Sequence, residues 1–157
     1  MKIELVENKK QSLYVYENDI LLFYSTIDFK WTKKNIIKIF DDKDDLILEI
    51  EILQLPFKLQ KIKILFQKTI EEKVIKDFTY DYILFNKNEN LKRQKDDFFD
   101  LNQNYSYSLK GIKIAQTKQK MWNSPQKISL EINDQYLYYK NLIIIHILVM
   151  RTGFNSD

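Results

Sequence analysis

The stretch NLIIIHILVM, residues 141–150, decides the fold of this chain, because it is the least polar segment and has a histidine in its middle. A helix that crosses a bilayer needs about 20 apolar residues, so this stretch is too short to be a membrane anchor. A segment that is apolar on every face is compatible with a buried strand or a buried helix, since its periodicity does not distinguish them. The choice therefore depends on the flanking residues.

These flanking residues favour a helix. Asn133 and Asp134 are good helix N-caps, and Gly153 suits the position that follows a helix C-terminus. Arg151 fits the last turn, where its charge interacts favourably with the helix dipole. About 18 residues lie between these signals, roughly 27 Å of helix at 1.5 Å per residue, which exceeds an ordinary strand. The β-branched residues disfavour a helix slightly, but the caps predict one, and a helix that is apolar all round must be enclosed by the rest of the chain.

Most of the preceding chain has the period of two that is typical of β-strands, with short polar turns between them. Asn18 and Asp19 form one expected turn, between strands in residues 12–18 and 19–26. Residues 35–53 have the pattern of a hairpin with its turn at 41–45. Further strands are expected within residues 57–67, 73–86, 105–118 and 126–133.

Two segments depart from simple alternation. The apolar face changes at Gln60 and Lys61, which predicts a bulge or a bend in the strand there. Residues 87–104 are the most polar part of the chain, and we expect a long loop there that holds at most a short helix.

About ten strands followed by one wholly apolar helix have a simple packing solution. The fold class expected is mainly β: a closed antiparallel β-barrel with the hydrophobic C-terminal helix running through its lumen. Closure removes the exposed edges of the sheet. The chain has no internal repeat or linker, so residues 1–157 are expected to form one domain. The alternative is a calycin-like barrel, which requires an open apolar lumen.

Three segments resemble the tubby-like barrel family, in particular its small LURP-one-related form. They are KWTKKNIIKIFDDKDDLILEI (residues 30–50), YSYSLKGIKIAQTKQKMW (105–122) and INDQYLYYKNLIIIHILVMRT (132–152). The likeness extends over about residues 12–152 as an ordered pattern and implies a barrel with a central helix, in a small bacterial member. Eukaryotic members bind phosphoinositide headgroups through basic surface residues, but this chain has no motif that places such ligands residue by residue.

The composition argues against several kinds of catalytic and metal site. The chain has no cysteine, which excludes disulfides, thiolate catalysis and cysteine-bound zinc. His146 is its only histidine, so a multi-histidine metal site is excluded; we expect a buried imidazole, hydrogen-bonded to backbone and with a lowered pKa. With two glycines, a glycine-rich phosphate loop is not expected. We therefore predict no enzyme activity, no cofactor and no metal. The N-terminus has no apolar run typical of a signal peptide, which favours a cytoplasmic location, at most peripheral to a membrane.

Two acidic clusters have ordinary structural explanations. Asp41 to Asp45 does not fit a calcium loop, because Leu46 and Ile52 stand at its sixth and twelfth positions. A hairpin turn is expected instead. Asp96, Asp97 and Asp100 are expected in a solvated loop.

Basic residues provide the main candidate for a binding surface. The candidate anion-binding residues are Lys30, Trp31, Lys33, Lys34, Lys61 and Lys63. A further group, Lys113, Lys118 and Lys120, precedes Trp122. Lysine beside tryptophan suits anionic headgroups, with the indole at the interface. The net charge of only +3 does not favour nucleic acid as the partner.

The functional hypothesis from the sequence is a non-catalytic binding module. It would present its Lys and Trp surface to anionic lipid headgroups or to a protein partner. The alternative is a bacterial interaction protein, such as a toxin-neutralising immunity protein or an accessory scaffold, in which the acidic patch at 96–100 meets a basic toxin. The sequence leaves the oligomeric state open.

Overall fold

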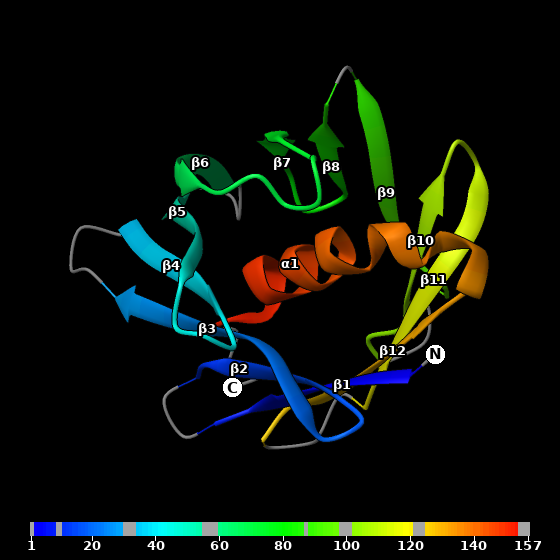
Figure 1. The fold of residues 1–157 in the computed structure, drawn as a ribbon, viewed down its shortest axis with the longest axis horizontal. Coiled ribbons are helices and arrows are strands. Elements are labelled where there is room, and N and C mark those ends of the chain that lie inside the picture. Colours follow the sequence, from blue (N-terminus) through cyan, green and yellow to red (C-terminus); the bar gives the residue numbers. More distant parts are fainter. Residues whose placement is uncertain are drawn as a thin grey trace.

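In the part of the chain that the computed structural model describes, one antiparallel sheet of twelve strands curls around a C-terminal helix (Figure 1). The structure describes residues 2–8, 11–29, 34–54, 60–86, 88–97, 102–120 and 125–153. The strands are β1 (Lys2–Glu7), β2 (Leu13–Glu17), β3 (Ile20–Phe29), β4 (Lys34–Asp41), β5 (Leu46–Gln54), β6 (Gln60–Gln67), β7 (Ile75–Phe78), β8 (Tyr82–Phe85), β9 (Glu89–Lys95), β10 (Tyr105–Leu109), β11 (Ile112–Gln119) and β12 (Lys127–Ile132). The helix α1 spans Lys140–Arg151.

The strand order explains how the sheet closes around the helix. It runs β6-β5-β4-β3-β2-β1-β12-β11-β10-β9-β8-β7. Each half of the chain is thus a series of hairpins, and the two halves join where β1 pairs with β12. The result is a nearly closed barrel whose two end strands, β6 and β7, face each other across a seam (Figure 1).

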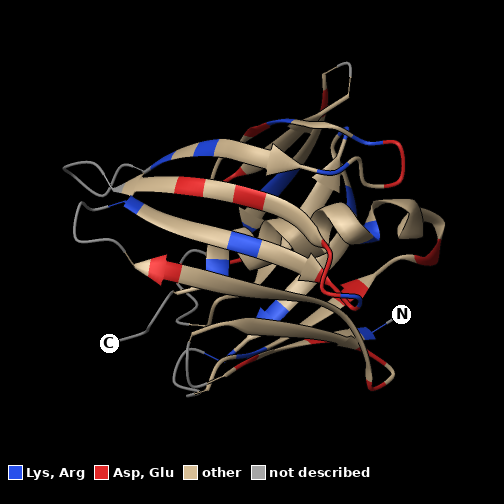
Figure 2. Cartoon of the chain, turned by 60° about the vertical axis from the view of Figure 1, so that its left-hand side comes forward, with Lys and Arg blue, Asp and Glu red and all other residues tan. Residues whose placement is uncertain are grey.

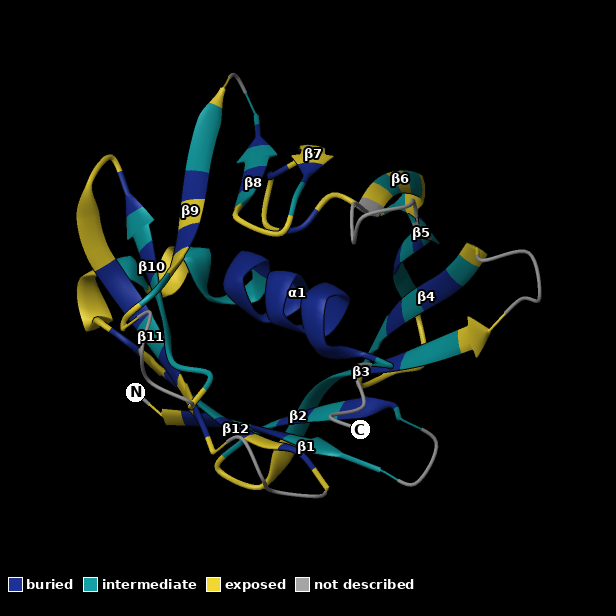
Figure 3. Ribbon diagram, turned by 180° about the vertical axis from the view of Figure 1, so that it is seen from behind, coloured by how far each residue is buried: buried dark blue, intermediate teal, exposed yellow. Residues whose placement is uncertain are grey.

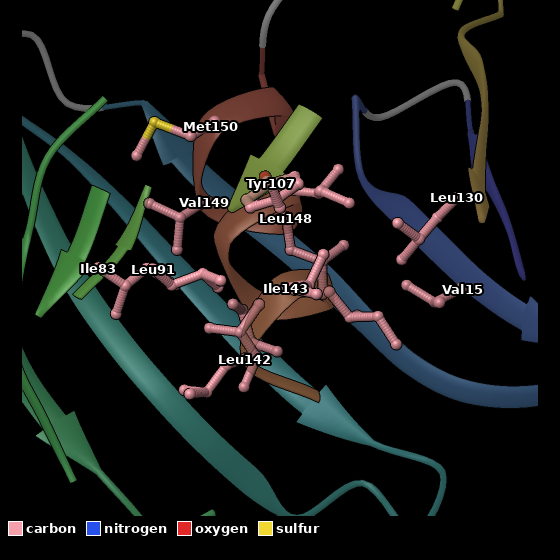
Figure 4. Packing of buried hydrophobic residues seen from close by; sticks show 14 of the residues in the cluster. Val15, Ile83, Leu91, Tyr107, Leu130, Leu142, Ile143, Leu148, Val149 and Met150 are labelled. Atoms are coloured by element: carbon pink, nitrogen blue, oxygen red, sulfur yellow. The ribbon is translucent and has the colours of Figure 1, made fainter. Parts of the chain in front are cut away.

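The helix fills the lumen of this barrel, as the sequence predicted. Every residue from Leu142 to Arg151 is buried, and Figure 3 shows this part of α1 in the colour of buried residues. Its side chains meet inward-facing residues from both halves of the sheet, such as Val15, Leu91 and Leu130 (Figure 4). Because no face of α1 is polar, enclosure by the sheet is what removes its apolar surface from water.

The helix ends where predicted but begins later. At the C-terminal end, Thr152 is the C-cap and Gly153 follows with φ of +73°. A side chain at Gly153 would be strained in this conformation and would also clash with Ile27. At the other end, Asn133 makes no side-chain capping hydrogen bond, and Asp134–Tyr139 forms a kinked 3₁₀ segment, η2, before α1. The α-helix is thus limited to the part of the predicted segment that the barrel encloses.

The predicted turns are present. Asn18 and Asp19 connect β2 to β3 with φ of 50° and 65°, the left-handed pair that a two-residue hairpin turn requires. In the turn between β4 and β5, the carboxylate of Asp41 accepts hydrogen bonds from the backbone N–H groups of Lys43 (3.0 Å) and Asp45 (2.9 Å). This carboxylate therefore organises the hairpin turn.

Other expectations need correction. Residues 87–104 are not one long loop, because β9 runs through 89–95. β1 was not predicted, although its alternating burial (Ile3 and Leu5 buried) follows from the sequence KIELVE. The register shift between β5 and β6 places the bulge at Leu65, not at Gln60 and Lys61, because Ile50 pairs with Ile64 and Glu49 with Phe66.

Complete closure of the sheet was also expected, and the described residues form a nearly closed barrel, with no ladder between β6 and β7. The side chain of Gln67 bridges the seam instead of a strand ladder. Its Nε2 donates to the Ile75 carbonyl (2.8 Å), and its Oε1 accepts from the Ile75 N–H (2.9 Å). One side-chain amide thus supplies the pair of hydrogen bonds that a neighbouring backbone would make, at one end of β6.

Candidate binding surfaces

The lumen holds a polar contact around His146. The imidazole Nε2 lies 2.9 Å from the Thr79 carbonyl, which accepts only, so Nε2 carries the proton. Nδ1 is then free to accept from the hydroxyl of Tyr107 at 3.0 Å. Burial lowers the pKa of His146 to about 3 and raises that of Tyr107 above its ordinary value. The prediction of a buried histidine that is hydrogen-bonded to backbone is confirmed, and the pKa of this imidazole is shifted in the expected direction.

The C-terminal end of the helix is fixed by a second polar network. Arg151 donates to the side chain of Gln126 (2.9 Å) and to that of Gln103. Gln126 in turn donates its backbone N–H to Glu7 on β1 (3.0 Å). Burial lowers the pKa of Arg151 to about 10. The network ties the last turn of α1 to β1 and the segment before β12, which gives it a structural role.

The barrel interior contains little empty space beside this network. The guanidinium of Arg93 lies over the rings of Tyr105 (3.5 Å to the centroid) and Tyr80 (4.6 Å). Arg93, Tyr105 and Arg151 line a cavity of about 10 Å³ beside Ile147, which is room for about one water molecule. α1 occupies the place where the calycin-like alternative requires an open lumen. Among the described residues, the larger hollows lie on the outer surface.

Two adjoining hollows lie on the outer face of β11, β12 and β1. Their volumes are about 590 and 410 Å³, and Lys2 lines both. The lysines that line one or the other are Lys2, Lys113, Lys118, Lys120 and Lys127. We call this region the β11–β12–β1 groove. Its lysines come from both ends of the chain and meet because β1 pairs with β12 and β12 with β11.

The groove carries an excess of positive charge. Glu4 lies 3.0 Å from Lys127, and Glu131 lies 3.6 Å from Lys118. The hydrogen bond from Lys127 lowers the pKa of Glu4, and the hydrogen bond from Gln116 lowers that of Glu131. With Asp96, which is 3.9 Å from Lys113, three carboxylates face five ammonium groups. An approaching anion would meet an excess of two positive charges.

The residues predicted as anion ligands are only partly described. Lys34, Lys61 and Lys63 lie on the outer face of β4 and β6 and are exposed. Glu51 stands between them, 3.6 Å from Lys34 and opposite Lys63 in the β5–β6 register. Figure 2 shows this alternation of basic and acidic residues on neighbouring strands. Lys30, Trp31 and Lys33 lie outside the described residues, as does Trp122.

The predicted acidic patch is likewise incomplete. Asp96 accepts a hydrogen bond from the hydroxyl of Ser106, and Lys113 partly compensates its charge. Asp100 lies outside the described residues. The described part of the patch therefore lies beside the basic groove and is partly neutralised by it.

Comparisons with protein-family models, curated proteins and solved structures found no match. The resemblance to tubby-like barrels thus stays a prediction from the sequence, whereas the nearly closed antiparallel barrel with its C-terminal helix is observed. Among the described residues, no helix has both the length and the apolar character needed to span a membrane.

Proposed function

We propose that this protein is a non-catalytic binding module whose β11–β12–β1 groove binds the anionic headgroups of a membrane surface. The observation that carries the proposal is the gathering of five lysines around two adjoining hollows on the outside of a barrel whose lumen is filled by its own helix. The tubby-like resemblance supports the same ligand class, because eukaryotic members bind phosphoinositide headgroups through basic residues.

The chemistry of the groove suits phosphate oxygens. Ammonium groups on flexible stems adapt to a point charge and reach out from the sheet toward an interface. Each lysine near an anionic membrane contributes about 1 kcal/mol to binding. The interaction acts over roughly the Debye length, about 8 Å at physiological ionic strength. Binding should therefore weaken with added salt. Removal of the charge of any one groove lysine should also weaken it.

Vesicle flotation tests the proposal. Phosphatidylcholine vesicles containing phosphatidylserine should retain the protein at low salt, and phosphatidylcholine alone should not. The double substitution Lys118→Gln and Lys127→Gln should weaken binding by roughly tenfold to thirtyfold, since two contributions of about 1 kcal/mol are lost. Both side chains are more than half exposed, so thermal unfolding should change little.

The matched control is Lys61→Gln with Lys63→Gln on the other side of the barrel. It removes the same amount of charge and also tests the two lysines that the sequence predicted as anion ligands. We expect it to bind vesicles like the unsubstituted protein. Equal losses in both variants would mean that net charge alone drives binding, and retention on uncharged vesicles would rule out headgroup recognition by charge.

A further inference from the structure

The seam of the barrel leaves one long strand edge without a ladder. β6 pairs with β5 on one side only, and it stands at the end of the sheet order opposite β7. The two hydrogen bonds between the Gln67 side chain and Ile75 bridge the seam at the end of β6. From Lys61 to Phe66, the described part of the chain contributes no strand to the other side. Backbone N–H and C=O groups that point away from β5 are therefore available to another strand.

The side chains of this edge also indicate incomplete coverage. Ile62 and Ile64 point toward the core but are only partly buried, whereas their partners Ile52 and Ile50 on β5 are 8% and 0% exposed. Beside the bulge, Leu65 is 45% exposed. Strand edges are usually covered or blunted in stable proteins, and on β6 the two lysines and the bulge at Leu65 discourage pairing with a second copy while the isoleucines stay partly uncovered. An added strand would cover the partly buried isoleucines and complete their packing.

The charges on β6 define what kind of strand would fit. Lys61 and Lys63 lie on the outer face, and no described carboxylate lies within 4 Å of either ammonium group. Side chains directly opposite each other in paired strands are about 5 Å apart, so opposite charges attract and like charges repel. A second copy paired antiparallel through β6 would place lysines near lysines on that face. Carboxylates are the favourable counterpart.

We propose that the free edge of β6 accepts an extended segment of a partner protein, one that alternates acidic side chains on its outer face with apolar side chains on its inner face. The backbone hydrogen bonds would hold the segment, and Lys61 and Lys63 would select for its acidic residues. This site is on a different part of the barrel from the β11–β12–β1 groove and does not depend on membrane binding.

A designed peptide tests the proposal with the intact protein. The probe is a blocked eight-residue peptide of alternating Glu and Val, equal in length to β6. Nuclear magnetic resonance should show chemical-shift changes and slower amide exchange centred on β6. A Lys and Val peptide of the same length should bind at least about fivefold more weakly, given two reversed cross-strand charge pairs. The acidic peptide methylated on alternate backbone nitrogens should lose binding, because one of its edges then has no donors.

The two lysine variants serve as reciprocal controls. The double variant Lys61→Gln and Lys63→Gln should bind the acidic peptide about fivefold more weakly than the unsubstituted protein does. The double variant Lys118→Gln and Lys127→Gln should bind it with an affinity within twofold of the unsubstituted value. Equal binding of the methylated peptide, shifts centred away from β6, or no binding at the highest soluble concentration would each overturn the proposal. Self-association through β6 without peptide would overturn it in favour of a second copy. None of these results alters the vesicle assay, so the two proposals fail separately.

Discussion

Replacing Leu148 by Ala is expected to lower the free energy of unfolding by about 3 kcal/mol, within the range of roughly 2–5 kcal/mol for buried leucines. The side chain is 0% exposed and lies among the buried residues of Figure 4. Its truncation removes apolar contacts and leaves a space at the centre of the barrel. Because α1 is enclosed by strands from both halves of the sheet, its surroundings cannot collapse without moving several strands. Urea denaturation monitored by circular dichroism measures the change.

Leu137→Ala is the matched control for this substitution. Leu137 lies on η2, outside the enclosed part of the helix, and is 37% exposed. The same chemical change there should cost less than about 1 kcal/mol. Similar small costs at both positions would show that residues 142–150 do not fill the centre of a packed barrel, and the argument for an outer binding surface would lose its basis.

The barrel and its helix could be predicted because the deciding signals are local. The apolar run and Gly153 specify a buried helix end, and the dipeptide Asn18-Asp19 specifies a turn. The helix start was missed because Asn133 and Asp134 have the right chemistry for a cap but precede a tyrosine-rich 3₁₀ segment. Capping signals alone do not distinguish an α-helix from a 3₁₀ turn that leads into one.

The missed strand β9 has a physical explanation. In ENLKRQK, the buried positions are Leu91 and Arg93, so a charged residue stands where alternation predicts an apolar one. Its guanidinium stacks on the rings of Tyr80 and Tyr105. Tyr80 lies in a turn and Tyr105 on another strand, and the periodicity of the sequence does not predict that either is close to Arg93. A buried cation stacked on aromatic rings gives no hydrophobic signal in its own segment.

The candidate groove was missed for a related reason. Lys113, Lys118 and Lys120 were recognised as a group, but Lys2 and Lys127 were not joined to them. These residues meet only through the pairing of the first strand with the last. Local alternation predicts that a strand exists, and it does not predict which distant strand will be its neighbour. The seam at β6 was missed likewise, since closure of the sheet depends on the same long-range pairing.

The stability of the protein is expected to fall with decreasing pH below about 6.5, by about 1.4 kcal/mol per pH unit from His146 alone. In the folded state burial lowers the pKa of His146 to about 3, while in the unfolded chain it has its ordinary value of 6.5. Well above pH 6.5 both states are neutral, and the histidine adds no pH dependence. Between these two pKa values the unfolded state binds one more proton than the folded state, so acid favours unfolding.

The slope can be assigned to one residue because His146 is the only histidine in the chain. Ordinary carboxyl groups titrate at about pH 4, well below the upper part of this window. Urea denaturation at several pH values between 5 and 6.5 should therefore report mainly on His146. Net stabilities of folded domains are about 5–15 kcal/mol, so a loss of about 1.7 kcal/mol over this range is readily measured.

The double substitution His146→Leu and Tyr107→Phe removes the titrating group together with the hydroxyl that it would leave unpaired. Its stability at neutral pH should fall, because the Thr79 carbonyl loses its donor, at a cost of about 1–3 kcal/mol. The informative quantity is the slope of the unfolding free energy against pH, which should fall to nearly zero between pH 5 and 6.5. Tyr107→Phe alone keeps the histidine and should keep the slope. If the double variant retains it too, the imidazole is already protonated in the folded lumen or reaches water, and the enclosure of α1 would have to be reconsidered.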